Sequence, residues 1–90
     1  MTGAEFVSIR EKCGLSQDQV AQYLGISRTT VWRIEGGVES VNLSIELSIN
    51  GMKAGSRTFN SWLAKLPPKT RMHIRRRQHR HNSNGSSGNP

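Results

Sequence analysis

The segment LSQDQVAQYLGISRTTVWRIEGG, at residues 15–37, constrains the fold more strongly than any other part of the chain. Ser16 and Gln19 have the three-residue spacing of a capping box, which begins a helix. Gly25 interrupts the helical pattern that follows, and Ser27 is a typical N-cap for a second helix. The segment therefore predicts two short helices that meet at a tight corner.

The residues around this corner form a specific pattern. Two helices that cross steeply through a short turn often need a glycine, and we expect a side chain at Gly25 to clash there. Ala21 lies one turn earlier, where the helices approach closely and only a small residue fits. Ile26, Val31 and Ile34 are apolar at spacings that direct them to a core. The combination predicts a helix-turn-helix.

The outward face of the second helix carries Arg28, Thr29, Trp32 and Arg33, with Thr30 near its edge. In DNA-binding proteins with this motif, the second helix enters the major groove. Arginine can bind guanine through two hydrogen bonds, and threonine can hydrogen-bond a base or contact a thymine methyl. The face therefore indicates base reading. For Trp32, packing on the preceding helix is the alternative.

Residues 15–37 resemble the helix-turn-helix of the Cro/phage-repressor (Xre-type) family, and the resemblance is close over residues 5–37. It implies an all-α, lambda-repressor-like bundle of four to five short helices that binds palindromic operators as a homodimer and mostly represses transcription. It assigns base reading to Arg28, Thr29 and Arg33, with Thr30 and Trp32 as flanking contacts.

The resemblance also assigns residues around the base-reading face. Gln17 matches a glutamine that contacts a phosphate and braces the recognition helix. We place Ser16 and Ser27, at the two helix starts, on the DNA backbone as well, because helix N-termini favour phosphate. Arg10 and Glu35 match a partly buried, structural ion pair between the first and third helices.

Three further segments complete the expected fold. A capping box at Thr2 begins a first helix that Gly14 ends. The stretch VNLSIELSI, residues 41–49, alternates like a strand that could pair across a dimer. Because a lone strand lacks a partner within a helical chain, we favour a short helix near Leu43–Asn50.

A clearer helix begins at Ser56 and stops before Pro67. Its apolar residues have the spacing of one helical face and form either core or a dimer seam: Phe59, Trp62, Leu63 and Leu66. We expect Phe59 and Leu63 to point inward, with Trp62 and Leu66 nearer a partner.

The net charge of +7 is unevenly distributed. Residues 1–66 carry seven Lys/Arg against six Asp/Glu, whereas residues 67–90 carry six Lys/Arg and no acid. We therefore divide the chain into a helix-turn-helix DNA-binding domain at 1–66 and a basic, disordered tail at 67–90. The tail is expected to grip DNA phosphates in place of the basic residues that are missing after Gly37, through Lys69, Arg71, Arg75, Arg76, Arg77 and Arg80. The alternative is a solvated end that only keeps the protein soluble.

Other classes of function find little support in the sequence. Cys13 is the only cysteine, so no internal disulfide forms, which fits a reducing, cytoplasmic setting. The chain lacks an apolar run long enough for a membrane and begins without the apolar run of a secretory signal. The histidines lie among arginines, which disfavours a metal: His73, His79 and His81. Without a catalytic constellation, we expect no enzyme and no cofactor.

We therefore expect a sequence-specific, dimeric DNA-binding regulator, most simply an (auto)repressor from a phage, plasmid or other mobile element, acting in the bacterial cytoplasm or nucleoid. Two alternatives stay open. One is a protein-interaction module, such as an antitoxin-like partner binder, that uses the segment after Gly37 and the Trp62 helix. The other is RNA binding through the arginine-rich tail.

Overall fold

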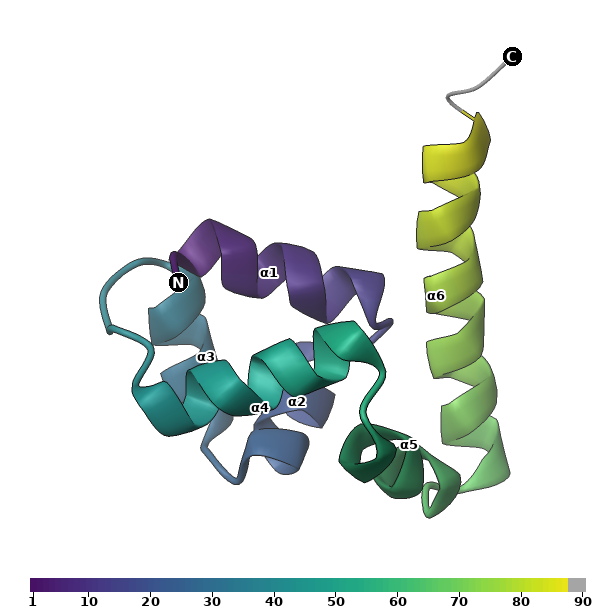
Figure 1. Ribbon diagram of the computed structural model, residues 1–90, viewed down its shortest axis with the longest axis horizontal. Coiled ribbons are helices and arrows are strands. Elements are labelled where there is room, and N and C mark those ends of the chain that lie inside the picture. Colours follow the sequence, from purple (N-terminus) through teal and green to yellow (C-terminus); the bar gives the residue numbers. More distant parts are fainter. Residues whose placement is uncertain (88–90) are drawn as a thin grey trace.

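The computed structural model describes the backbone of residues 1–87 and the side chains of residues 1–81. This part of the chain contains six helices and no strand: α1 (Gly3–Lys12), α2 (Gln17–Leu24), α3 (Arg28–Glu35), α4 (Leu43–Ala54), α5 (Arg57–Ala64) and α6 (Pro68–Ser87). The expected all-α class is confirmed. Figure 1 shows α1 to α5 gathered into a bundle, with α6 standing along one side of it.

Side-chain caps begin each of the first five helices. In each case the oxygen of the preceding residue accepts a hydrogen bond from the amide three positions later; these residues are Thr2, Ser16, Ser27, Asn42 and Ser56. The predicted capping boxes at Thr2 and Ser16 both form. At the first, the Thr2 amide donates to Glu5, which holds the pKa of that carboxyl below its usual value. Short-range polar contacts thus fix the helix starts.

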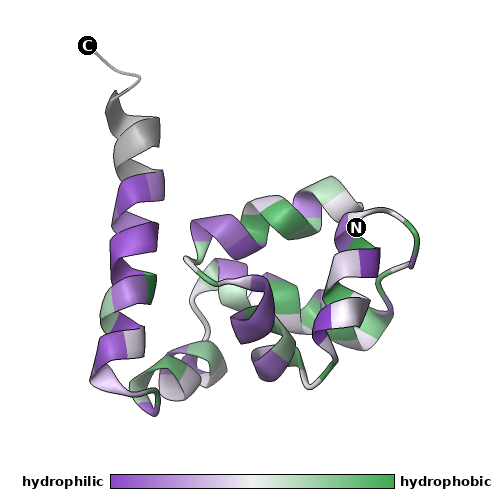
Figure 2. Cartoon of the chain, turned by 180° about the vertical axis from the view of Figure 1, so that it is seen from behind, coloured by the Kyte–Doolittle hydropathy of each residue, from purple (hydrophilic) through white to green (hydrophobic). Residues whose placement is uncertain are grey.

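The apolar core lies where α1 to α5 converge, and the apolar residues gather on the inner faces of these helices (Figure 2). Phe6, Val20 and Val31 are completely buried. They come from α1, α2 and α3, so their packing holds the helix-turn-helix against the first helix. Deleting one such side chain typically costs about 2–5 kcal/mol.

Residues 43–54 form a helix, as favoured, and the strand alternative is wrong. Ile45, Ile49 and Met52 are buried at helical spacing, whereas Leu43 and Leu47 are 71% and 63% exposed. The apolar–polar alternation of residues 41–49 resembles a strand only because Leu43 and Leu47, which lie on the outer face of α4, are apolar. Asn42 caps the helix and Gly55, with φ of 70°, ends it.

The apolar face of α5 meets α2 through aromatic side chains. Phe59 is buried as expected, and Tyr23 lies edge-on to both Phe59 and Trp62, with ring centroids 5.3 and 5.2 Å apart. Trp62, Leu63 and Leu66 are all half-buried and pack against the core. The expected division into inward Leu63 and outward Trp62 and Leu66 is therefore not visible in their burial.

Gly25 is required for a different reason from the one expected. A Cβ atom built on it would have no atom within 4 Å, so the predicted clash is wrong. Its φ is +72°, a left-handed conformation that residues with a side chain rarely adopt. The backbone conformation of the corner, and not the space around it, selects glycine.

The expectation of a disordered tail from residue 67 is wrong for the segment that follows Pro68, which forms α6 and docks on the bundle. Ile74 is only 2% exposed and belongs to the core. Gln78 Nε2 donates to the Cys13 carbonyl at 2.9 Å, and Arg77 Nη1 donates to the Gly14 carbonyl at 3.3 Å. Carbonyls at the end of a helix lack hydrogen-bond partners within that helix. Arg77 and Gln78 donate to two carbonyls that follow α1, and these hydrogen bonds anchor α6.

The division into a domain at residues 1–66 and a tail at residues 67–90 stays a prediction, and α6 contacts α1 across that division. Disorder was also expected for the last nine residues, for which no side chain is described. Residues 88–90 lie outside the described residues.

Gly14 should be the glycine least tolerant of substitution. It has φ of +77°, and a Cβ there would lie 2.4 Å from the Ile74 carbonyl oxygen of α6. At Gly25, which has the left-handed backbone but open space, alanine should cost about 1–2 kcal/mol of unfolding free energy. Gly14→Ala should cost a further 1–3 kcal/mol or so, because α6 must move. Urea unfolding of the two variants measures the difference, and equal losses would mean that α6 is not docked on Gly14.

Candidate nucleic-acid interface

The first turns of α3 present a polar surface because its apolar residues are committed to the core. Val31 and Ile34 are 0% and 1% exposed, so helical spacing turns the intervening positions outward. Arg28, Thr29 and Arg33 are exposed, and Trp32 is 64% exposed. The exposure of Trp32 argues against the alternative in which it packs on α2.

Ser27 and Thr30 hold the first turn of α3 in place. The Ser27 hydroxyl accepts a hydrogen bond from the Thr30 amide at 3.1 Å. It also lies 2.9 Å from the Thr30 hydroxyl, so the two side chains share a hydrogen bond. Ser27 therefore acts first as a cap, and Thr30 is half-buried beside it.

Arg28 is only weakly held. Its Nε lies 3.7 Å from Asp18 Oδ1, and the two side chains are 66% and 62% exposed. An exposed pair of this kind contributes about 0–1 kcal/mol. Arg28 can therefore exchange Asp18 for another acceptor at little cost.

A hydrogen-bonded network around Glu35 joins α1, α2 and α3. Arg10 binds both carboxylate oxygens, with Nε 2.6 Å from Oε2 and Nη2 3.2 Å from Oε1. Gln17 Nε2 donates to the same Oε1 at 3.0 Å, and Arg10 Nη1 donates to the Leu15 carbonyl at 3.0 Å. The Arg10 and Glu35 side chains are 14% and 10% exposed. The network sets the orientation of α3 against the start of α2.

The start of α2 lies beside the α3 face. Gln17 lines a shallow surface hollow of about 210 Å³ together with Arg28, Thr29 and Trp32. One amide hydrogen of Gln17 is used on Glu35, and a second is available. Ser16 caps α2 with its oxygen, which leaves its hydroxyl hydrogen to donate. These groups could hold a phosphate next to the exposed face of α3.

The loop after α3 offers no cation, as its sequence indicated: Val38, Glu39 and Ser40 are exposed, and Val38 is 75% exposed.

The basic side chains of α6 are exposed but divided between two places. Arg77 Nη1 lies 3.0 Å from Gln19 Oε1, beside the start of α2. Arg71 and Arg75 instead line a hollow near α5.

Lys69 and Arg76 are exposed on α6. Sequence reasoning grouped all these cations into one tail and missed that Arg77 docks against the helix-turn-helix. Ile74, an apolar residue within a run of arginines, was the available signal that part of the tail packs.

The cysteine and the histidines form no metal centre in the part of the chain that the structure describes, where no three metal-binding side chains cluster. Burial raises the pKa of the Cys13 thiol, although Lys12 opposes this shift, so the thiol is protonated at neutral pH. Its Sγ donates to the Met52 carbonyl at 3.7 Å. No helix of the described residues is both long and apolar enough to cross a membrane.

Residues 3–45 match the family model described as "Helix-turn-helix domain", which covers α1 to α3 and the beginning of α4. No curated protein and no solved structure matches the chain. The match supports a DNA-binding regulator in general terms, on the same residues that carry the exposed α3 face.

The Glu35 network should be worth far more than the exposed pair between Arg28 and Asp18. Glu35→Gln leaves the Arg10 charge in a site that is largely closed to water, and should lower the unfolding free energy by about 3 kcal/mol. Asp18→Asn, the matched carboxylate-to-amide control, should cost less than about 1 kcal/mol. Urea unfolding measures both. Similar losses for the two variants would contradict a structural role for the network.

Proposed function

We propose that this chain, whose residues 3–45 form a helix-turn-helix domain of the Xre/Cro-like group, is a sequence-specific transcriptional regulator that acts on double-stranded DNA. The observation that carries the proposal is the first part of α3. Arg28, Thr29, Trp32 and Arg33 are exposed while Val31 and Ile34 are buried. This exposed face lies beside an α2 start that can receive a phosphate. The proposed role is binding, without catalysis or a cofactor, in the bacterial cytoplasm or nucleoid.

In this proposal α3 enters the major groove. Arg28 and Arg33 bind guanine edges, and Thr29 contacts a neighbouring base. Thr30 and Trp32 contact the flanks of the site. Backbone contacts come from Ser16, Gln17 and Ser27 at the two helix starts. The Glu35 network supports this reading because it fixes the angle at which α3 leaves α2.

We further propose that the protein acts as a homodimer on a palindromic operator and represses transcription, including that of its own gene in a mobile element. Three exposed apolar residues support a protein contact next to α3: Val38, Leu43 and Leu47. An interface there, only a short loop beyond α3, would hold two copies of α3 at a fixed separation. Half-sites should then lie about 10 base pairs apart.

The same apolar residues support a second candidate, in which the surface binds a different protein, such as a toxin, and DNA contact is secondary.

The basic side chains of α6 are proposed to add general attraction to nucleic acid: Lys69, Arg71, Arg75 and Arg76. RNA is then the competing ligand. The two experiments below separate these candidates.

Removing either base-reading arginine should relax sequence preference. An operator would first be selected from random-sequence duplexes, and binding then measured by fluorescence anisotropy against a scrambled duplex. Arg28→Ala and Arg33→Ala should each weaken operator binding by about 1–3 kcal/mol, or about 5- to 150-fold, with little effect on the scramble. Arg57→Ala, an exposed arginine on α5, is the charge-matched control. Selection of no sequence, or equal losses on both duplexes, would refute the proposed function.

Charging the apolar surface should separate the two copies. Leu43→Lys with Leu47→Lys replaces side chains that are mostly exposed, so the fold should persist, and sedimentation should change from dimer to monomer. Met72→Lys, at an exposed apolar residue of α6, should leave the dimer intact. A wild-type protein that sediments as a monomer at micromolar concentration would contradict the homodimer and favour a different partner.

A further inference from the structure

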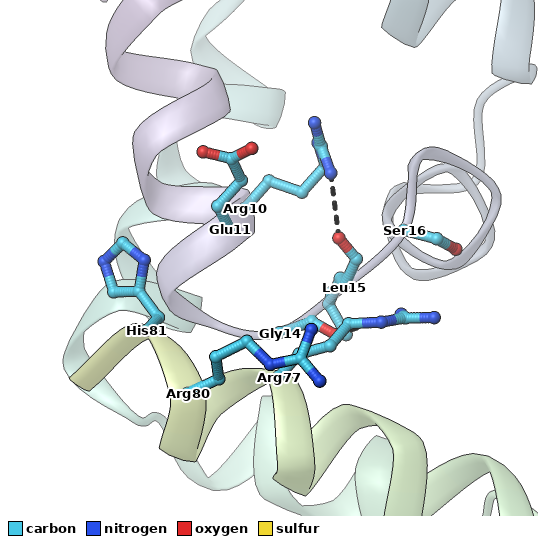
Figure 3. Close-up of a pocket in the computed structure, with 8 residues that line it drawn as sticks. All are labelled: Arg10, Glu11, Gly14, Leu15, Ser16, Arg77, Arg80 and His81. Carbon is cyan, nitrogen blue, oxygen red and sulfur yellow. Dashed lines mark hydrogen bonds between the residues drawn. The ribbon is translucent and has the colours of Figure 1, made fainter. Parts of the chain in front are cut away.

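A groove of about 420 Å³ lies where α6 meets the junction of α1 and α2 (Figure 3). Its walls come from three parts of the chain: Arg10 and Glu11 of α1, the corner at Gly14, Leu15 and Ser16, and Arg77, Arg80 and His81 of α6. Figure 3 shows the arginine side chains of α6 reaching toward that corner. Residues more than 60 positions apart in sequence thus share one surface feature.

The groove is electropositive, and its uncompensated cations come from α6. The Arg10 guanidinium is already paired with Glu35. Arg77 donates to the Gly14 carbonyl and to Gln19 Oε1, which are neutral acceptors, so these contacts position its guanidinium without cancelling its charge. Arg80 is exposed, and Glu11 is the one carboxylate that lines the groove.

The groove and the hollow beside the proposed base-reading face are lined by neighbouring residues. Ser16 lines it, and the next residue, Gln17, lines the hollow that also contains Arg28 and Trp32. A strip of polar groups therefore runs from α3, across the start of α2, to the arginines of α6. A nucleic-acid strand that passes the start of α2 would meet Arg77 and Arg80 next.

We propose that this groove binds the phosphate backbone of the DNA strand that flanks the major groove occupied by α3, and that Arg77 and Arg80 each neutralise one phosphate. The inference rests on the proposed function. Arg77 and Arg80 would supply the phosphate contacts that the loop after α3 cannot make, because residues 38–42 contain no cation. Guanidinium groups suit this task because their planar donors match phosphate oxygens.

The geometry also distinguishes these two arginines from their neighbours on α6. At about 100° per residue, Arg77 and Arg80 lie on one flank of the buried Ile74, and Arg71 and Arg75 lie on the other. Arg71 and Arg75 line a hollow with Asn60 and Leu63 of α5, away from the start of α2. The two pairs carry the same charge, so they provide a matched comparison of position.

The experiment measures how operator affinity depends on salt. Each phosphate neutralised adds about 0.9 to the slope of log affinity against log salt for duplex DNA. Arg77→Gln with Arg80→Gln should therefore reduce the slope by about 1.8, and Arg80→Gln alone by about 0.9. Arg71→Gln with Arg75→Gln should reduce the slope clearly less than the Arg77 and Arg80 double variant does, because Arg71 and Arg75 add only general attraction to nucleic acid. Because Arg77 also anchors α6, circular dichroism melts accompany each variant, and Arg80→Gln tests the groove without removing a hydrogen bond of the fold.

Glu11→Gln supplies a test of opposite sign. Removing the carboxylate from the groove should raise operator affinity at low salt, since it removes repulsion of the phosphate. An unchanged or weaker affinity would contradict a phosphate in the groove.

The remaining outcomes separate this inference from the proposed function. Equal salt slopes for the two double variants would overturn the proposal that the groove binds phosphate. If both slopes were lowered equally, only a general effect of charge on α6 would remain. In another outcome, the protein prefers its operator, Arg28→Ala abolishes that preference, and Arg80→Gln leaves the salt slope unchanged. That outcome would overturn phosphate binding in the groove and leave the proposed function intact. If no operator is selected, the proposed function fails, and the same variants on random duplex and on duplex RNA still decide the groove. A slope change confined to RNA would overturn it.

Discussion

The carboxylate of Glu35 is the group on which the arrangement of the helix-turn-helix depends. It sits at the end of α3, yet its partners are Arg10 from α1 and Gln17 from the start of α2. A mostly buried charge is costly unless its partners satisfy it, so the three elements are confined to the relative positions that complete the network. Because α3 is thereby fixed against α2, the exposed α3 side chains and the polar groups at the start of α2 keep a constant spacing.

The helix starts and the corner could be predicted from sequence because short-range chemistry determines them. A cap oxygen such as that of Ser16 needs only an amide three residues later, and both are visible in the sequence. The reason given for Gly25 was wrong, although the residue was identified, since a sequence does not separate a requirement for space from a requirement for positive φ. The pairing of Arg10 with Glu35 came from family resemblance.

The docking of α6 could not be predicted in the same way. Composition indicated a disordered tail, because a helix with one buried apolar side chain gains little from burial alone. What holds α6 is complementary to the end of α1: the Cys13 and Gly14 carbonyls lack helical partners, and Gln78 and Arg77 supply donors. These contacts span 63 and 65 positions and depend on the completed fold, as does the groove that they help to form.

Placing cations on a docked helix has a different consequence from placing them on a flexible tail. A flexible tail must lose conformational entropy when it binds, whereas an arginine already held against the start of α2 has lost part of that entropy on folding. The acceptors that hold Arg77 are neutral, so its charge remains available to a phosphate. The contacts that anchor α6 to α1 thus also place a cation beside the first turn of α2. Stability of α6 docking and affinity for a polyanion are therefore linked, because a ligand that binds only the docked arrangement stabilises it.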